Sequence, residues 1–308
     1  MKTKNKNGIL SYSYYGAIIL AVWIWASVFL VSKTALAYIG PITIATIRLL
    51  IAFVFLSPIS IRNGFKFREL FSKQVLIYGT IGYGLHLIFF YNALAECSAA
   101  VASTISGLLP LYMMILGYAM LKEKIKTLRV VGSILSVVGV IIAAFAGVAG
   151  NVGTSILGVL LMAVSSLSWG FCSVYSKRYM KEMNTWVQTE LMFGATLLLL
   201  IPMTFIEIYN LGIPEITTSG MLSLLYLGAI GSAGGIALWN YSLKGIEAGL
   251  AGVIFNFLPG VGVLLAYMVG EKTKLIQFVG CLLIVLGVIV TSKKEKVVIK
   301  MEEKSWTS

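Results

Sequence analysis

The chain has 308 residues, of which 58% are hydrophobic and 12% are charged, and it carries a formal net charge of +12. A soluble globular domain has about 45–50% apolar and about 25% charged residues. This composition therefore excludes a soluble enzyme or binding domain and indicates an integral membrane protein.

Apolar runs recur along the whole chain and are separated by short polar segments. An α-helix of about 20 residues crosses a bilayer, and a helix satisfies its own backbone groups where lipid offers no partner. We therefore predict an all-α integral membrane protein with ten transmembrane helices. In chain order these are residues 14–33, 41–58, 75–95, 99–121, 127–147, 155–176, 184–206, 220–241, 248–269 and 273–292.

The first predicted helix also has features of a secretory signal peptide. The basic start MKTKNK precedes it, and ALA at 35–37 resembles a cleavage site. The apolar region of this helix, however, is longer than the roughly 7–15 residues of a signal peptide. Removal of the helix would also leave the internal repeat of the chain incomplete. We therefore expect this helix to be retained.

Lysine and arginine are concentrated on one side of the predicted membrane. Twenty of the 24 basic residues fall in segments on the side of the N-terminus, whereas the loops on the other side hold only Lys272 and Lys274. Because basic loops stay in the cytoplasm, both termini are predicted to be cytoplasmic, in a multi-pass protein of the cell membrane. This topology explains the net charge, so we predict no nucleic-acid partner. Residues 293–308 are predicted to form a disordered basic cytoplasmic tail.

The two halves of the chain share a sequence pattern in their first helices. Trp25 and Lys33 in WASVFLVSK recur as Trp169 and Lys177 in WGFCSVYSK. The two residues are eight positions apart in both halves. Such agreement in residue type and spacing indicates an internal repeat.

The fourth helices of the two halves show the same relationship. LLPLYMMILGYAMLKEK at 108–124 recurs as FLPGVGVLLAYMVGEK at 257–272. These matches divide the chain into a first repeat at 1–147, a linker loop at 148–154 and a second repeat at 155–292.

Each repeat contains five predicted helices. Since five is an odd number, the second repeat enters the membrane upside down relative to the first. Inverted repeats are the construction of many secondary transporters, in which the substrate site lies near the membrane midplane where the halves meet. A duplication that serves only the stability of the fold is the alternative.

This order of motifs resembles the EamA family of the drug/metabolite transporter superfamily. The resemblance rests on WASVFLVSK and WGFCSVYSK in the first helix of each repeat. It rests equally on SAAVASTISGLLPLYMMILGYAMLKEK and EAGLAGVIFNFLPGVGVLLAYMVGEK in the fourth, and it covers residues 14–292. The resemblance implies a secondary carrier for amino acids, sugars, amines or related metabolites, often moved outward. Its partners would be a small-molecule substrate, membrane lipids, and protons or a counter-transported solute.

Pro110 and Pro259 lie near the middle of matching helices. Proline has no amide donor, so the carbonyl groups of Ser106 and Phe255 lose their usual partner, and in a bilayer they need water, protein or substrate. We predict helix interruptions at the midplane here, with Ser106 and Asn256 as candidate substrate-binding residues. A packing kink against a neighbouring helix is the alternative.

Three ionisable side chains lie within predicted helices, where charges are costly and usually face a cavity or a partner. Arg48 is a candidate clamp for an anionic group of the substrate, and Glu190 is a candidate ammonium partner or proton carrier. His86, the one histidine of the chain, is a candidate for proton coupling. Together Arg48 and Glu190 could hold the two ends of a zwitterion. The alternatives are a direct ion pair between them, snorkelling to the interface, and a structural histidine.

Aromatic and amide side chains complete the candidate substrate site: Trp25, Tyr83, Asn92, Trp169 and Asn240. Aromatic walls suit an apolar or aromatic substrate, or a cation. Tyr91, Trp239 and Trp186 lie closer to helix ends, and we assign them to the aromatic belts at the membrane surface.

The residues that the chain lacks exclude several catalytic mechanisms. All twelve acidic residues are glutamate, which excludes an aspartyl protease and phosphorylation on aspartate. The sequence has no GxxxxGK[ST] loop for ATP. A single histidine without an acidic cluster indicates neither a metal nor another cofactor, so we predict a protein that is not an enzyme.

We predict a secondary transporter that works by alternating access and exports amino acids or related metabolites. Import of a small cationic or sugar-like compound is the second interpretation, and multidrug efflux is the third. A non-transporting membrane scaffold and an intramembrane enzyme acting on lipid are the remaining alternatives. The sequence indicates no oligomeric state.

Overall fold

The computed structural model describes residues 2–125, 127–149, 153–215, 217–270 and 275–292. Within these ranges it contains helices and turns and no strand. Two of the helices, η2 and η4, are π-helical, whereas η1 and η3 are 3₁₀-helical. In chain order the helices are α1 (Lys2–Leu36), α2 (Pro41–Arg62), η1 (Phe67–Phe71), α3 (Lys73–Leu76), η2 (Ile77–Gly84), α4 (Leu85–Glu96), α5 (Ala99–Ile105), η3 (Ser106–Leu108), α6 (Leu109–Leu121), α7 (Thr127–Ala149), α8 (Ile156–Tyr179), α9 (Thr185–Leu211), α10 (Thr218–Leu225), η4 (Tyr226–Gly234), α11 (Gly235–Leu243), α12 (Ala248–Phe255), α13 (Phe257–Met268) and α14 (Leu275–Ser292).

Helices occur in each of the ten ranges predicted to span the membrane. Within the described residues, eight helical segments are long and apolar enough to cross a bilayer. The apolar stretches Val130–Ile142 of α7 and Leu275–Gly287 of α14 are shorter. The predicted tail at 293–308, the predicted outer loop at 271–274 and the centre of the linker at 150–152 lie outside the described residues.

The outer surface of the helix bundle is apolar. Large hydrophobic side chains are exposed on it, among them Trp23, Phe145, Phe205 and Leu275. A monomeric soluble protein rarely exposes large contiguous apolar patches, whereas lipid accommodates such a surface. The protein is therefore a multi-pass protein of the cell membrane.

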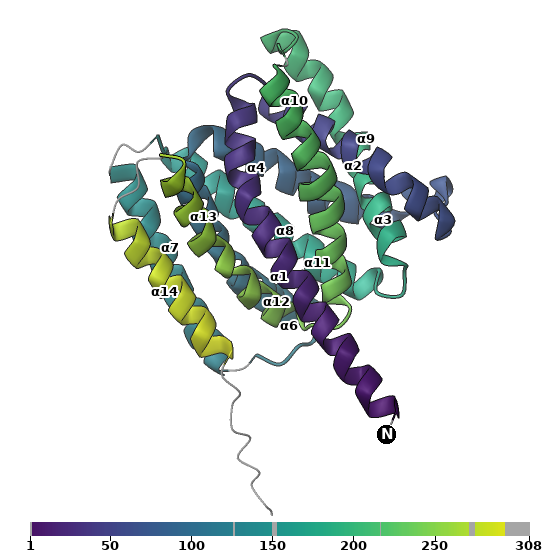
Figure 1. The fold of residues 1–308 in the computed structure, drawn as a ribbon, viewed down its shortest axis with the longest axis vertical. Coiled ribbons are helices and arrows are strands. Elements are labelled where there is room, and N and C mark those ends of the chain that lie inside the picture. The colour runs from purple at the N-terminus through teal and green to yellow at the C-terminus, as the bar shows by residue number, and fades with distance from the viewer. Residues whose placement is uncertain (1, 126, 150–152, 216, 271–274, 293–308) are drawn as a thin grey trace, which may run out of the picture.

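Helices at matching positions of the two halves pack against one another (Figure 1). α1 of the first half packs along α11 of the second, and reciprocally α8 packs along α4. α2 and α9 pack together on one side of the molecule, and α7 and α14 pack together on the opposite side. This reciprocal pairing is consistent with two repeats related by a pseudo-two-fold axis.

Glycines allow α7 and α14 to approach closely. A Cβ atom on Gly139 would lie 2.5 Å from the carbonyl oxygen of Gly280, and a Cβ atom on Gly287 would collide with the carbonyl oxygen of Gly132. Small residues provide this kind of close backbone contact between membrane helices. The four glycines occupy matching positions of the two halves, so the contact is reciprocal.

Two pairs of spans are interrupted at matching places. The span Lys73–Glu96 consists of α3, η2 and α4, and the span Thr218–Leu243 consists of α10, η4 and α11. Each therefore contains a π-helical segment, of eight and nine residues respectively. The span Ala99–Leu121 consists of α5, η3 and α6, and the matching segment of the second half consists of α12 and α13. π-Helical turns frequently mark functional sites. In this fold, residues of η2, η3, α12 and α13 line a central cavity.

Candidate functional site

The central cavity lies between helices of both halves. It is small, with about 60 Å³ open to the centres of water-sized molecules. Six of the residues predicted for the substrate and proton sites line it, namely Trp25, Arg48, Tyr83, His86, Ser106 and Trp169. Sequence reasoning missed other lining residues, among them Phe29, Phe90, Ser165, Ser166 and Phe255.

Three tryptophans form the aromatic centre of this site. The ring centroids of Trp25 and Trp169 are 5.4 Å apart, and the rings are nearly perpendicular at 85°. Trp239 lies 5.5 Å from Trp25 and 5.9 Å from Trp169, and ring pairs at these distances attract one another. Trp239 is fully buried, so its assignment to an interfacial belt is wrong, and it packs against both cavity tryptophans instead.

The two matching tryptophans differ in their hydrogen bonds. The indole N–H of Trp25 donates to the carbonyl oxygen of Gly231 in η4 at 2.9 Å. Trp169 lines the cavity, and its indole N–H donates to no residue that the structure describes. The repeat therefore places one satisfied and one available donor at equivalent positions.

Arg48 brings a buried positive charge to the cavity. Its guanidinium donates from Nε to Oγ of Ser232 at 2.8 Å and from Nη1 to the hydroxyl of Tyr91 at 2.8 Å. Arg48 is only 3% exposed, and within the described part of the chain no carboxylate forms an ion pair with it. Tyr91 is fully buried and its ring lies 5.7 Å from the guanidinium. Its assignment to an interfacial belt is therefore wrong, because Tyr91 orients the arginine.

Glu190 lies away from this cavity. Its Oε1 accepts a hydrogen bond from Oγ of Ser57 at 2.6 Å, whereas its Oε2 has no hydrogen-bond partner among the residues described. Ser57 is nine residues beyond Arg48 on α2, a rise of about 13.5 Å along the helix. The described residues thus contain no Arg48–Glu190 ion pair, and the two charges do not lie around one small zwitterion.

His86 faces the cavity from α4. Its Nδ1 lies 2.9 Å from Oγ and 3.1 Å from the carbonyl oxygen of Ser165. Between ring centroids, His86 is 5.7 Å from Tyr83 and 5.3 Å from Trp169. The structure therefore places this histidine where α4, α8 and the cavity meet.

The predicted asparagines lie outside the cavity lining. Asn92 donates to a backbone carbonyl within its own helix at 2.8 Å. Asn240 donates to Oγ1 of Thr189 at 3.0 Å, and Asn256 donates to Oγ of Ser136 at 3.1 Å. Asn240 and Asn256 therefore join neighbouring helices.

The helix interruptions near Pro110 and Pro259 face each other across the two halves. Pro110 is the second residue of α6, after η3, and Pro259 is the third residue of α13. A Cβ atom on Gly107 would lie 3.6 Å from Cγ of Pro259, and one on Gly252 would lie 2.9 Å from Cα of Pro110. The residue four positions before each proline lines the cavity.

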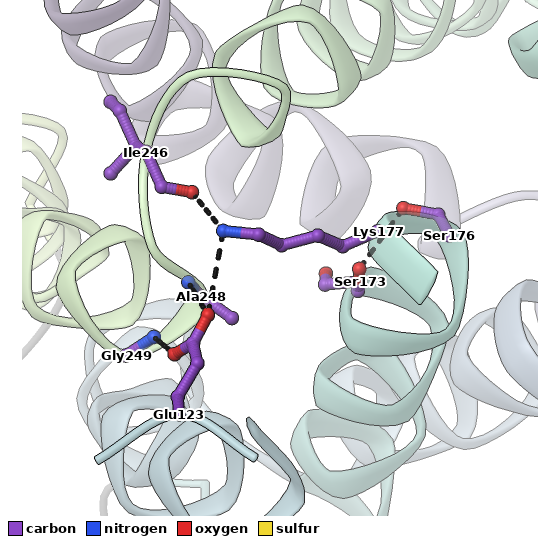
Figure 2. A network of polar contacts seen from close by, with 7 residues as sticks. All are labelled: Glu123, Ser173, Ser176, Lys177, Ile246, Ala248 and Gly249. Atoms are coloured by element: carbon purple, nitrogen blue, oxygen red, sulfur yellow. Dashed lines mark hydrogen bonds and ion pairs between the residues drawn. The ribbon is translucent and has the colours of Figure 1, made fainter. Parts of the chain in front are cut away.

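A polar network joins three helices at one end of the bundle (Figure 2). Glu123, just after α6, accepts hydrogen bonds from the backbone N–H groups of Ala248 at 3.0 Å and Gly249 at 3.3 Å, which begin α12. Lys177 of α8 lies 3.4 Å from the same carboxylate and donates to the carbonyl oxygen of Ile246 at 2.5 Å. A carboxylate is favourable here because it satisfies free amides and complements the dipole of the helix.

The matching lysine of the first half makes similar contacts. Lys33 donates to the carbonyl oxygens of Leu94 and Cys97, both at 2.7 Å. These carbonyls precede α5, as Ile246 precedes α12. Each half therefore uses the lysine of its first helix to hold the chain before an interrupted helix of the fold.

Both halves of the chain match the EamA-like transporter family, at residues 13–145 and at residues 156–293. The uncharacterized transporter YyaM of Bacillus subtilis is 26% identical over 273 residues, which cover 86% of this chain and 88% of that protein. A probable amino-acid metabolite efflux pump of Salmonella typhimurium is 24% identical over 284 residues, 87% of this chain and 91% of the pump. A solved crystal structure shares the fold, with a TM-score of 0.71 and 20% identity over 91% of this chain and 96% of the matched chain. Because the family pattern occurs in both halves and covers most of the chain, this protein belongs to the EamA-like transporter family.

Proposed function

We propose that the protein is a secondary transporter that moves small metabolites through the central cavity by alternating access, and that it exports amino acids or related metabolites. The observation that carries this proposal is the cavity, which is lined from both family repeats and combines aromatic walls with a buried cation. The family and the relatives indicate a transporter rather than an enzyme. The name of the Salmonella pump supports amino-acid metabolites and the outward direction.

In this proposal all ten helical segments cross the membrane, including α7 and α14, and both termini lie in the cytoplasm. The first repeat comprises residues 1–147 and the second residues 155–292, joined by the loop at 148–154 and followed by the tail at 293–308. Each repeat then has five spans, so the second is inverted relative to the first. Inversion accounts for the pairing of α1 with α11 and of α8 with α4.

Alternating access requires that the two ends of the cavity close in turn. With cytoplasmic termini, the Glu123–Lys177 network closes the cytoplasmic end, because it ties the start of α12 to α6 and α8. Lys33 holds the chain before α5 at the opposite end. The interruptions beside Pro110 and Pro259 supply hinges, since a helix break absorbs backbone rotation.

The roles of the lining residues follow from their chemistry. Arg48 holds an anionic group of the substrate, and the rings of Trp25 and Trp169 contact its body. His86 exchanges the coupling proton, because it contacts both the cavity and α8. Glu190 is the second candidate proton carrier, since its Oε2 is buried and without a partner in the described residues. A counter-transported solute is the alternative to protons.

Solute flux through the reconstituted protein tests this function. The protein is placed in proteoliposomes loaded with labelled amino acids or with labelled carboxylate derivatives that lack the amine, and release is followed with an imposed proton gradient or with solute on the opposite side. We expect saturable release that protein-free liposomes lack. Flux of only amines or sugars would favour the second interpretation. No flux of any amino acid, carboxylate derivative, amine or sugar would refute transport and favour a scaffold.

A further inference from the structure

We propose that the transported solute is a compact monocarboxylate with an apolar or aromatic body, that Arg48 holds its carboxylate, and that the cavity recognises no ammonium group. This inference rests on the proposed function, since it names the class of solute that the same cavity takes. Amino-acid derivatives without a free amine belong to this class, whereas amines and zwitterionic amino acids do not.

Arg48 carries a full charge and has only neutral partners. A guanidinium has five N–H donors, and the hydroxyls of Ser232 and Tyr91 accept from Nε and Nη1. Its Nη2 donates to no residue in the described ranges. A buried charge inside a membrane protein is unfavourable unless it is paired. The site is therefore matched to an anion.

The number of cationic groups favours one negative charge on the solute. Among the described lining residues, Arg48 is the one permanently charged side chain, so it balances a single negative charge. A planar guanidinium matches a carboxylate with paired hydrogen bonds. Trp169 also lines the cavity, and its indole N–H has no hydrogen-bond partner among the described residues, so we assign it as a second donor to the carboxylate. A doubly charged phosphate would leave one charge without a partner.

The described cavity lining contains no anionic side chain that could pair with an ammonium group. Glu190 lies away from the cavity, where it accepts a hydrogen bond from Ser57, and the chain contains no aspartate. An ammonium group would meet ring faces and hydroxyls while facing the charge of Arg48. The attraction of a ring for a cation is weaker than the repulsion between two full charges at a similar distance.

The remaining walls fit an apolar body. Phe29, Phe90, Trp25 and Phe255 line the cavity beside the arginine. With about 60 Å³ open to the centres of water-sized molecules, the cavity suits a compact solute rather than an extended one.

Four ligands that share one phenyl ring test the charge of the solute. They are 3-phenylpropionate (an anion), phenylalanine (a zwitterion), 2-phenylethylamine (a cation) and 3-phenylpropanamide (neutral). Binding to the full-length protein in detergent is measured by the rise in melting temperature, since a ligand that binds the folded state stabilises it. We expect 3-phenylpropionate to bind roughly tenfold more tightly than the amide, because its hydrogen bonds are charge-assisted. Tighter binding of phenylalanine or of the amine than of the anion would overturn the proposal.

Variants of Arg48 test the residue. In Arg48→Gln, the preference for the anion over the amide should fall from roughly tenfold to about one. Arg48→Lys keeps the positive charge but loses the paired N–H donors of the guanidinium, so it should keep part of the preference for the anion over the amide. Arg62→Gln, the same change at the exposed end of α2, should leave it unchanged. If Arg48→Gln does not fold, the ligand series on the wild type and Arg48→Lys decide. A preference that survives in Arg48→Gln overturns the assignment.

Failure of this inference can be separated from failure of the proposed function. If proteoliposomes carry an amino acid, amine or sugar and 3-phenylpropionate does not compete, the monocarboxylate class is wrong and transport stands. If 3-phenylpropionate competes and is itself carried, both are supported. Absence of flux for every solute tested contradicts the proposed function.

Discussion

Glu123→Gln is expected to destabilise the end of the bundle where α6, α8 and α12 meet (Figure 2). Glutamine keeps the size of the side chain and one oxygen, but it loses the charge. One of the N–H groups of Ala248 and Gly249 then faces an amide NH₂ instead of an acceptor, and Lys177 loses its anionic partner at 3.4 Å. The N-cap residue of α12, Glu247, makes no capping hydrogen bond with its side chain, so no local cap replaces Glu123.

Three contributions determine the size of this effect. A buried backbone N–H without a partner costs about 1–3 kcal/mol. Loss of a negative charge at a helix N-terminus costs about 0.3–1 kcal/mol. The side chains of Lys177 and Glu123 are 17% and 15% exposed, and we take roughly 0.5–1 kcal/mol for their ion pair, the upper part of the range for exposed pairs. Together they predict a loss of about 2–5 kcal/mol in the free energy of unfolding.

Thermal unfolding of the purified protein measures this loss. At about 2–4 °C per kcal/mol, the melting temperature should fall by roughly 4–20 °C. Glu215→Gln makes the same chemical change at an exposed position before α10 and should leave the melting temperature nearly unchanged. Combining Glu123→Gln with Lys177→Met should cost less than the sum of the two single changes, because both break one ion pair. An unchanged melting temperature, or fully additive effects, would refute the reasoning.

Two further substitutions test contacts that hold the helices together. Glu207→Gln should lower the free energy of unfolding by about 1–2 kcal/mol, because its carboxylate accepts hydrogen bonds from two backbone N–H groups at the start of α2; a shift in melting temperature no larger than that of Glu215→Gln would contradict this. Gly139→Ala should destabilise by about 1–3 kcal/mol, since its Cβ atom would lie 2.5 Å from the carbonyl oxygen of Gly280 and force α7 away from α14. Gly260→Ala, whose Cβ atom would have no neighbour closer than 3.8 Å, should be neutral or stabilising, and thermal unfolding of the two variants side by side checks the difference.

The positions of the helices were predictable because lipid leaves the backbone one hydrogen-bonding solution and sets its minimum length. The interruptions beside Pro110 and Pro259 were predictable for a similarly local reason, since proline lacks one N–H group. The π-helical segments η2 and η4 have no such local signal. Their glycines indicate close packing between helices, and nothing in that pattern distinguishes an α-helical from a π-helical turn.

The side of each helix that faces the cavity was not predictable, because it depends on helices distant in the sequence. Tyr91 and Asn92 are neighbours, yet Tyr91 is buried against Arg48 whereas Asn92 bonds within its own helix. A place near a helix end favours an interfacial role for Tyr91 and Trp239. In the fold, α8 covers α4 and α1 covers α11, so both side chains are buried.

The distance between Arg48 and Glu190 was also not predictable from the sequence. Their similar depths in two inverted repeats predict that they lie near each other. α2 and α9 run antiparallel, and two side-chain hydrogen bonds fix their register: Thr46 pairs with Thr204, and Ser57 donates to Glu190. Arg48 therefore lies about two and a half helical turns from the position opposite Glu190. Register between two helices is set by packing along their whole length, which residue depth alone does not predict.

Trp25 and Trp169 allow a matched test of which features are structural and which serve the ligand. Trp25→Phe removes the hydrogen bond from the indole to the carbonyl oxygen of Gly231 and should cost about 0.5–1.5 kcal/mol of stability beyond the loss of ring volume. Trp169→Phe loses the same ring volume but breaks no hydrogen bond to a described residue, so its melting temperature should fall less.

In Trp169→Phe, the binding of 3-phenylpropionate should weaken by roughly fivefold or more, because a donor to the carboxylate is lost. Equal losses of stability in the two variants, with ligand binding unchanged in Trp169→Phe, would contradict the assignment. Since the two tryptophans occupy matching positions of the repeat, any difference between the variants reports the surroundings of each ring, and in these surroundings the two halves of the transporter have diverged.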